Sequence, residues 1–342
     1  MPPDLSSRLR HSKETLMTSL THIVTGAAGF IGRNVVARLN QTGAHDLLLV
    51  DELGSSEKWR NLLGLVYEDI LQPQAFLDFI RNSPPPPDLR CVIHLGACSA
   101  TTETNADYLL ENNYRFSREL CEWCLKHDIR FVYASSAATY GDGSLGYNDA
   151  DKETPKYRPL NMYGYSKHMF DLWALKNGYL DQIAGLKYFN VYGPFEQHKG
   201  DMRSVVHKAT EQILSTGNVQ LFRSHRPDYE DGKQLRDFVY IRDAVDVTLW
   251  LSDRKAPSGL FNCGTGQARS WLDLVQAVFQ ALEKKPDIEF IDMPAHLQPK
   301  YQYYTQAEMS KLRAAGYQRP FTSLEDGVQE TVQSILKLHK IH

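Results

Sequence analysis

Short apolar runs alternate with longer amphipathic segments through the first half of the chain. The runs are four to six residues long, as buried strands are, and lie at 22–25, 47–51, 91–95, 130–135 and 184–188. Between them, residues 30–43, 108–127 and 163–177 carry apolar side chains at helical spacing. Strands joined through helices make a parallel sheet, because a parallel connection needs a long crossover. The pattern therefore predicts the α/β class, with a doubly wound parallel sheet of the Rossmann type.

The alternation becomes less regular after Asn190, where turn signals such as Gly193-Pro194 interrupt it. A strand-like run at 238–241 and a helical pattern at 243–251 follow, and we expect both to return to the main sheet. The predicted parts are a disordered tail at 1–20, a Rossmann domain from 21–188 plus 236–262, and a smaller C-terminal α/β substrate-binding domain from 189–235 plus 263–342.

Composition and charge narrow the class of protein. The 342 residues are 42% hydrophobic with a formal net charge of -3, which fits a soluble globular protein that binds neither nucleic acid nor membranes by charge. No run of about 18 apolar residues and no signal-like segment is seen, so we expect a cytoplasmic protein. Five cysteines without an export signal indicate reduced thiols. Cys121 and Cys124 form a CxxC with no second ligand pair nearby, so we expect core packing and no metal site.

A glycine pattern stands between the first strand and the first helix. Gly26, Gly29 and Gly32 form G-x-x-G-x-x-G, which lets the backbone turn tightly and approach a pyrophosphate held by the helix N-terminus. Asp51 ends the second strand about twenty residues later, where a carboxylate accepts a hydrogen bond from the adenosine ribose. The combination predicts a site for a nicotinamide dinucleotide.

The residues leave the choice between NAD and NADP open. Asp51 favours NAD, whereas Arg33 and Lys58 are cations placed where a 2′-phosphate can be met. Asp69 and Ile70, after the third strand, are candidates for contact with the adenine, and a solvated loop carboxylate is an equal alternative for Asp69. Further along the chain, the small residues Gly96 and Ala97 let the backbone pass close to the cofactor.

A serine, a tyrosine and a lysine supply candidate chemistry. Tyr163 and Lys167 are four positions apart on a predicted helix, so both side chains leave one face. An adjacent ammonium and an oxidised nicotinamide ring both favour the phenolate, which prepares Tyr163 for proton exchange with a substrate hydroxyl. Ser136 stands at a strand end beside the expected cofactor crevice, where its hydroxyl can bind the reacting oxygen.

Longer motifs around these residues identify a family. They are GACSATTE at 96–103, YASSAATYG at 133–141, NMYGYSK at 161–167, YFNVYGP at 188–194, HKG at 198–200, RDFVY at 236–240 and LRAAGY at 312–317. Over nearly all of residues 21–342 the chain resembles the extended short-chain dehydrogenase/reductase superfamily, and within it the ADP-glyceromanno-heptose 6-epimerases.

The resemblance implies an activity. Members convert ADP-D-glycero-β-D-manno-heptose to its L-glycero epimer at C6, by transient oxidation to a ketone and return of the hydride to the opposite face. The product is a precursor of the lipopolysaccharide inner core. The resemblance also implies one tightly bound NADP per subunit, with NAD as the alternative, and a homo-oligomer.

The resemblance further implies roles for individual residues. Lys199 in the HKG motif is the candidate for a second acid/base, with binding of the substrate diphosphate as its alternative role. Cofactor contacts are implied for Phe30, Ile31, Glu52, Leu95, Cys98, Ser99, Asn112 and Val191. Substrate contacts are implied for Ser99, Ser136, Asn190, Lys199, Asp201, Lys208, Phe222, Arg236 and Tyr301.

Some positions depart from the family pattern and leave other substrates open. Leu95 replaces a common glutamate, Asp201 a small residue and Lys208 a histidine. A UDP-sugar 4-epimerase of the same superfamily is the main alternative, and a net dehydrogenase is another. A 4,6-dehydratase is disfavoured, because it needs an acidic pair where this chain has Ala137, Ala138 and Thr139.

Overall fold

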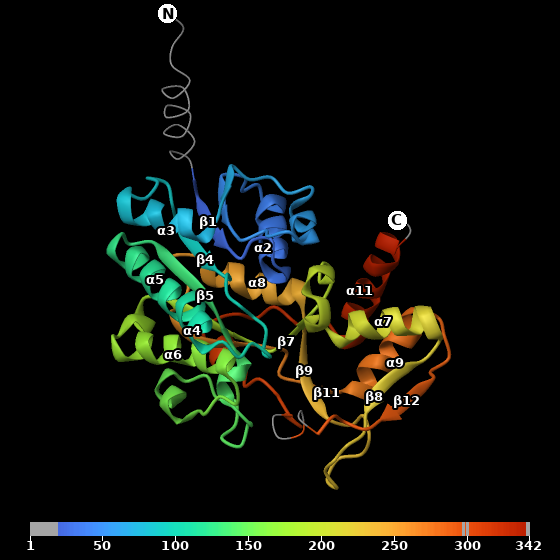
Figure 1. The fold of residues 1–342 in the computed structure, drawn as a ribbon. Coiled ribbons are helices and arrows are strands. Elements are labelled where there is room, and N and C mark those ends of the chain that lie inside the picture. The colour runs from blue at the N-terminus through green and yellow to red at the C-terminus, as the bar shows by residue number, and fades with distance from the viewer. Residues whose placement is uncertain (1–19, 296–297, 299–300, 340–342) are drawn as a thin grey trace, which may run out of the picture.

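A seven-stranded parallel sheet forms the centre of the larger of two lobes (Figure 1). The computed structural model describes residues 20–295, 298 and 301–339. The strands run in the order β10-β6-β5-β4-β1-β2-β3. Their bounds are β1 His22–Thr25, β2 Leu47–Val50, β3 Asp69–Leu71, β4 Cys91–His94, β5 Arg130–Ser136, β6 Ala184–Tyr188 and β10 Gly259–Cys263. The order reverses between β1 and β4, which places a ligand crevice at the carboxyl ends of these two strands.

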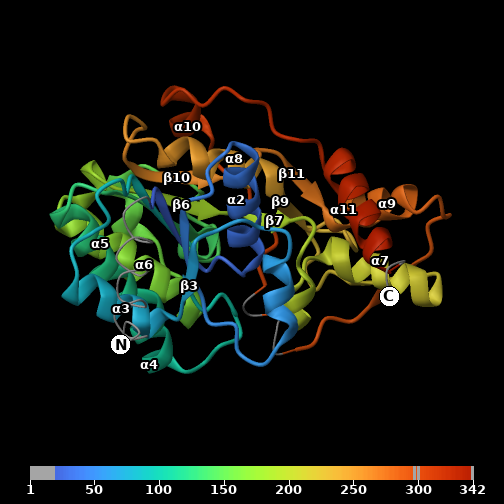
Figure 2. The same cartoon turned by 90° about the horizontal axis from the view of Figure 1, so that it is seen from above.

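Helices cover both faces of this sheet because successive strand residues point to opposite sides. Ile23 packs with helices α3 (Pro73–Asn82), α5 (Phe116–Lys126) and α6 (Met162–Lys176). Val24, the next residue, packs with α2 (Phe30–Gln41) and α8 (Ile241–Ser252). Figures 1 and 2 show the two layers from different sides. Strands buried on both faces carry the continuous apolar runs that predicted them.

The smaller lobe contains two short sheets and three longer helices. One sheet has the order β11-β9-β7, and the other pairs β12 with β8. The strand bounds are β7 Asn190–Tyr192, β8 Val219–Phe222, β9 Leu235–Tyr240, β11 Ala268–Ser270 and β12 Ile288–Ile291. The helix bounds are α7 Val205–Thr216, α9 Trp271–Ala281 and α11 Leu324–His339. The short helix α10 (Ser310–Ala314) contacts β10 of the main sheet.

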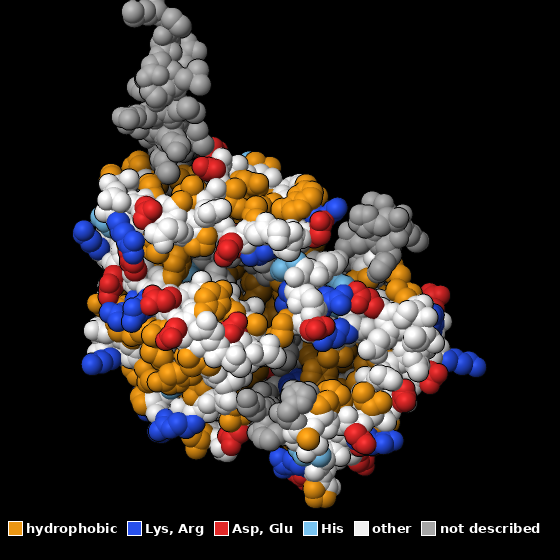
Figure 3. All heavy atoms as spheres, viewed as in Figure 1, with side chains coloured by type: hydrophobic (Ala, Val, Ile, Leu, Met, Phe, Trp, Pro, Cys, Tyr) orange, Lys and Arg blue, Asp and Glu red, His pale blue; other side chains and the backbone are white. Residues whose placement is uncertain are grey.

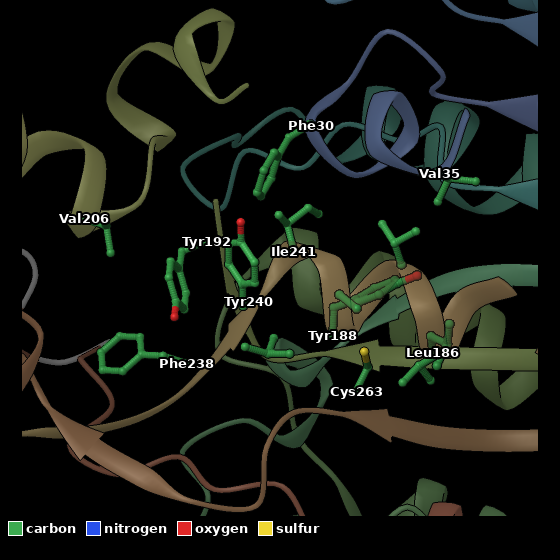
Figure 4. Close-up of a cluster of buried hydrophobic side chains, with 14 of the residues drawn as sticks. Phe30, Val35, Leu186, Tyr188, Tyr192, Val206, Phe238, Tyr240, Ile241 and Cys263 are labelled. Carbon is green, nitrogen blue, oxygen red and sulfur yellow. The ribbon is translucent and has the colours of Figure 1, made fainter. Parts of the chain in front are cut away.

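One hydrophobic core runs from the larger lobe into the smaller lobe (Figure 4). Leu186 and Tyr188 of β6 contribute to it beside Ile241 of α8, and Tyr192 and Val206 extend it into the smaller lobe. Since the apolar contacts continue across the junction, they fix the position of the smaller lobe against the carboxyl end of the main sheet.

The sequence predicted the helix after β9 correctly and the strand incorrectly. α8 packs on α2 and on the main sheet, as expected. β9 does not join that sheet, because its backbone pairs in parallel with β7 and antiparallel with β11. An apolar run indicates that a strand is buried but not which sheet it joins. β9 is buried in the small sheet. The division of the chain into two domains stays a prediction.

The predicted helix 108–127 has three parts. α4 (Ala106–Leu109) is followed by a π-helical segment at Leu110–Arg115 and then by α5. Wider π-helical turns place side chains out of register with the α-helical stripe, and they are frequent near functional sites. In this chain the segment carries two consecutive asparagines at 112 and 113.

Several remaining expectations concern thiols, termini and membranes. Cys121 and Cys124 are buried in the core between α5 and the sheet, as predicted. The described residues contain no cluster of three or more potential metal ligands. No helix in the described part of the chain is long and apolar enough to cross a bilayer. The predicted tail lies, except for Leu20, outside the described residues.

Candidate active site

The glycine loop connects β1 to α2 with no room for side chains at two positions. Gly26 has φ +68°, and a Cβ on it would lie 2.7 Å from the backbone nitrogen of Gly96. A Cβ on Gly32 would overlap the carbonyl oxygen of Gly26. Gly29 is the N-cap of α2 and offers no capping side chain, so the first amides of the helix are available to an anion.

Asp51 is the polar centre of the adjoining strand end. Its Oδ2 accepts a hydrogen bond of 2.7 Å from Ala28 N in the glycine loop. Its Oδ1 accepts 2.7 Å from its own neighbour Glu52 N and lies 2.5 Å from Lys58 Nζ. The carboxylate therefore holds the loop in shape and at the same time holds a lysine at the mouth of the site.

Arg33 does not join Lys58 in this role. Its guanidinium lies 3.7 Å from the ring centre of Phe195, a residue of the smaller lobe. Its buried Nε has no hydrogen-bond partner among the described residues, and burial lowers the pKa of the side chain. The expectation that Arg33 faces a 2′-phosphate is therefore not met in this structure, because the cation is stacked on an aromatic ring.

A cavity of about 430 Å³ lies between the glycine loop and the smaller lobe. The surface in Figure 3 is hollowed between the two lobes, with hydrophobic side chains visible inside. Thirteen of the predicted site residues line the cavity: Gly26, Phe30, Ile31, Gly32, Leu95, Ala97, Ser99, Ser136, Tyr163, Lys167, Asn190, Val191 and Lys199. Residues from four separate strand ends thus meet at one space, as the doubly wound topology requires.

A second, connected set of predicted residues lines the clefts beside Asp51. Glu52, Lys58, Gly96, Cys98 and Asn112 surround a cleft of about 390 Å³ together with Ala97. Ile70 lines the neighbouring cleft beside α3. Asp69 lines none of these three spaces, and its exposed carboxylate accepts a hydrogen bond from Ile70 N.

The remaining predicted substrate residues belong to the smaller lobe and do not line the main cavity. Arg236 is buried with its guanidinium 5.1 Å from the ring of Tyr301 and 5.6 Å from the ring of Trp271, which itself lines the main cavity. Trp271 Nε1 donates a hydrogen bond of 2.9 Å to Tyr301 Oη. Phe222 ends β8, whereas Asp201 and Lys208 are described but do not line the cavity.

Helix α6 presents the tyrosine and the lysine to the cavity. The helix begins where Asn161 Oδ1 accepts a hydrogen bond of 2.7 Å from Gly164 N, one residue after Tyr163. Burial raises the pKa of Tyr163, and a hydrogen bond with Ser136 opposes this rise. Burial lowers the pKa of Lys167 to about 8, against the opposing charge of Asp171. Desolvation thus moves the pKa of Tyr163 upward, opposite to the direction expected from the ammonium and an oxidised nicotinamide ring together.

Lys199 reaches the same cavity from the smaller lobe. Its Nζ lies 3.0 Å from Oε2 of Glu196 and 4.9 Å from the ring centre of Phe30. Glu196 is fully buried and also accepts hydrogen bonds from the backbone nitrogens of Gly193 and Ser204. The carboxylate thereby fixes the loop that carries Lys199.

Sequence reasoning missed two positioning residues. Glu196 stands three residues before Lys199, and this spacing was its only signal. Asn113 was hidden in a helical pattern. Its side chain exchanges two hydrogen bonds with the backbone of Cys98, at 2.8 and 3.0 Å, and donates to Ser166 Oγ at 3.0 Å. Asn113 therefore ties the loop after β4 to the helix that carries Tyr163.

Known proteins are similar to this chain in sequence and in fold. The sequence matches the NAD dependent epimerase/dehydratase family over residues 22–264. A relative from Nitratidesulfovibrio vulgaris, named ADP-L-glycero-D-manno-heptose-6-epimerase, is 55% identical over 315 residues, which are 92% of this chain and 98% of the relative. The crystal structure of the Helicobacter pylori ADP-L-glycero-D-manno-heptose-6-epimerase aligns with a TM-score of 0.75 and 26% identity over 94% of this chain and 97% of that one.

A more distant likeness concerns the fold alone. UDP-glucose 4-epimerase from Thermotoga maritima aligns with a TM-score of 0.76 and 24% identity over 94% of this chain and 100% of that one. The predicted Rossmann architecture and the predicted family resemblance are both confirmed. The chain belongs to the NAD dependent epimerase/dehydratase family, in the group of its ADP-L-glycero-D-manno-heptose-6-epimerases.

Proposed function

We propose that this protein converts ADP-D-glycero-β-D-manno-heptose to ADP-L-glycero-β-D-manno-heptose, by epimerisation at C6. The observation that carries the proposal is the shared cavity: Tyr163 enters it from α6 and Lys199 from the smaller lobe. Epimerisation through a ketone needs proton exchange with substrate oxygen in two orientations of the sugar, and two acid/base groups from different walls can serve both. The names of relatives with 55% identity support the choice of substrate.

The residues at the glycine loop fit a nicotinamide dinucleotide. A Cβ at Gly26 or Gly32 would collide with backbone, and the uncapped amides of α2 suit a pyrophosphate. Gly26 and Gly32 would pass beside the pyrophosphate, Asp51 and Lys58 would hold the adenosine end, and Tyr163 and Lys167 would border the nicotinamide end. When bound, the nicotinamide supplies a reversible hydride acceptor for the carbinol carbon.

The chain itself handles the protons. Tyr163 takes the proton from the C6 hydroxyl as the carbon is oxidised, and Ser136 donates a hydrogen bond to the same oxygen. The ammonium of Lys167 stabilises the phenolate that forms. After the sugar has turned, Lys199 returns a proton to the oxygen, and Glu196 keeps its ammonium in place. No net oxidation results.

We propose NADP as the cofactor, with Lys58 binding the 2′-phosphate. Lys58 Nζ is already held beside Asp51, at the strand end where the ribose hydroxyls are recognised in this fold. A bound phosphate would compete with Asp51 for this ammonium and leave the Asp51 carboxylate bonded to Ala28 N. Release of the dinucleotide from freshly purified protein, followed by mass measurement, distinguishes NADP from NAD.

The nucleotide part of the substrate is assigned to the cluster of Arg236, Trp271 and Tyr301. The buried guanidinium faces aromatic rings and can bind a diphosphate in a bidentate manner. Phe222 and Asn190 complete the proposed substrate contacts.

From the group to which it belongs, we expect the protein to act in the cytoplasm as a homo-oligomer. Light scattering on the purified holoenzyme would measure the oligomeric state.

The test is turnover without added cofactor. Purified protein is incubated with ADP-D-glycero-β-D-manno-heptose, and the C6 configuration is followed by NMR beside a Tyr163→Phe variant. Conversion by the wild type that the variant loses supports the proposal. A folded protein that carries bound dinucleotide and leaves the heptose unchanged contradicts it, and a UDP-sugar 4-epimerase then becomes the function to test.

A further inference from the structure

A buried ion pair lies one helical turn beyond Lys167, on the face of α6 that carries Tyr163 and Lys167. Lys187 Nζ on β6 lies 2.8 Å from Oδ2 of Asp171 on α6, and the two side chains are 1% and 0% exposed. The same carboxylate accepts hydrogen bonds of 2.8 Å from Tyr133 Oη and 2.7 Å from Ser135 Oγ on β5. Asp171 thereby connects α6 to two neighbouring strands.

The pair is connected to three of the four proposed catalytic residues: Tyr163, Lys167 and Ser136. Tyr163, Lys167 and Asp171 follow one another at intervals of four residues, on one face of the helix. On the sheet side, Ser135 immediately precedes Ser136. Lys187 Nζ also donates a hydrogen bond of 2.7 Å to Thr139 Oγ1, and Thr139 donates 2.8 Å to the carbonyl oxygen of Ser136. The network is therefore hydrogen-bonded to the strand end that carries Ser136 on both sides of that residue, through Ser135 and through Thr139.

Stability alone gives a weak reason for this pair. Removing two charges from water is costly, and apolar residues of similar size often replace a buried ion pair without loss of stability. The same helix already packs on the sheet through Phe170, whose ring lies 4.6 Å from that of Tyr133. An apolar contact does not fix the orientation of the helix. Three charged or polar partners on one carboxylate do fix the position of that carboxylate.

We propose that Asp171 and Lys187 are positioning residues, which hold the Tyr163–Lys167 face of α6 in register with Ser136. The proposal rests on the proposed function in so far as Tyr163, Lys167 and Ser136 act in that reaction. Neither Asp171 nor Lys187 lines the cavity, so both act through other residues.

The pair also has an electrostatic effect on Lys167. The charge of Asp171 raises the pKa of Lys167, against the burial that lowers it. The other groups that interact with this ammonium are Cys98, from the loop after β4, and His94 on β4. His94 is neutral near pH 7, because burial lowers its pKa to about 3. Asp171 is thus the carboxylate that helps Lys167 to stay protonated.

Three variants separate positioning from plain stability: Asp171→Asn, Lys187→Met and the double variant that carries both changes. Each single variant leaves one buried charge without its partner and should lower the melting temperature. The double variant leaves neither charge of the pair and should recover much of it. If the pair positions the catalytic face, kcat of the double variant stays about 10- to 100-fold below wild type, while KM and bound cofactor stay within twofold. Recovery of kcat together with the melting temperature would overturn the proposal.

A second measurement does not depend on the substrate. The pKa of Lys167 is determined by NMR in protein with isotope-labelled lysine, with Lys167→Arg used for assignment. Asp171→Asn should lower this pKa by about one unit or more, and an unchanged value contradicts the electrostatic part of the proposal. Asp128→Asn, which removes an exposed ion pair with Arg254, is the matched control and should change nothing. If wild type leaves the heptose unchanged, the proposed function fails while this titration still tests Asp171.

Discussion

Lys58 Nζ lies 2.5 Å from Oδ1 of Asp51, so the cation proposed for the 2′-phosphate is held by the carboxylate proposed to bind the ribose hydroxyls. The two residues are only seven positions apart in the chain: Asp51 directly follows β2, and Lys58 lies in the 3₁₀ helix at Glu57–Leu62. Asp51 favours NAD and Lys58 favours NADP. Because the two side chains are in contact, the cofactor preference depends on both.

Lys58→Met should therefore weaken NADP binding by about 10- to 100-fold, the range expected for one lost hydrogen bond to a charged group. NAD binding should change by less than threefold, because Asp51 remains bonded to Ala28 N. Calorimetric titration of cofactor-free protein with each dinucleotide measures both. Arg60→Met is the control, since Arg60 pairs with the exposed Glu57 on the same short helix. Equal weakening of NAD and NADP would show that Lys58 acts only through Asp51.

The sequence predicted the main sheet well for a physical reason. β1 and β6 lie at the predicted residues, and β2, β4 and β5 differ from the prediction by one residue at the carboxyl end. Strands buried on both faces leave a continuous apolar run with few alternatives. β9 has the same kind of apolar run, but it belongs to the small sheet. Its partners β7 and β11 are too short to show a distinctive sequence pattern.

The candidate site was predictable where a local motif carries the chemistry. The glycine spacing and the Tyr163–Lys167 spacing each depend on one turn or one helix. Glu196 acts through neighbours three to eight residues away, at spacings too common to single it out. Asn113 and the Asp171–Lys187 pair depend on contacts between different elements of the fold, which no local pattern records. The stacking of Arg33 on Phe195 is of the same kind, because it joins the two lobes.

Gly26→Ala should abolish tight cofactor binding and destabilise the fold by about 1–3 kcal/mol, the cost of a strained backbone position. The added Cβ would meet the backbone of Gly96 at 2.7 Å, in the loop that lines the cofactor clefts. Gly43→Ala is the matched control, because Gly43 has φ +88° with nothing within 4 Å of the added Cβ. It should lower the melting temperature and keep the dinucleotide. Loss of cofactor from both variants would assign the effect to general instability.

Glu196→Gln should reduce kcat by about 10- to 100-fold, since Lys199 loses a hydrogen bond to a charged group. The amide oxygen can still accept from Gly193 N or Ser204 N, so most of the loop should remain in place. Steady-state kinetics and thermal melting, compared with the exposed variant Glu153→Gln, measure the two effects. If kcat matches the control while stability falls, Glu196 serves only the fold of the loop.

The alkaline side of the pH profile should report Lys167. Burial lowers the pKa of this ammonium from 10.5 to about 8. The protonated form, which stabilises the Tyr163 phenolate, is therefore present below pH 8 and is lost as the pH rises through that value. We expect kcat of the wild type to fall by about tenfold per pH unit above pH 8, the slope of a single titrating group. Lys167→Arg keeps its charge to much higher pH, so its smaller kcat should stay level across the same range. A decline at the same pH in both proteins would assign the titration to another group.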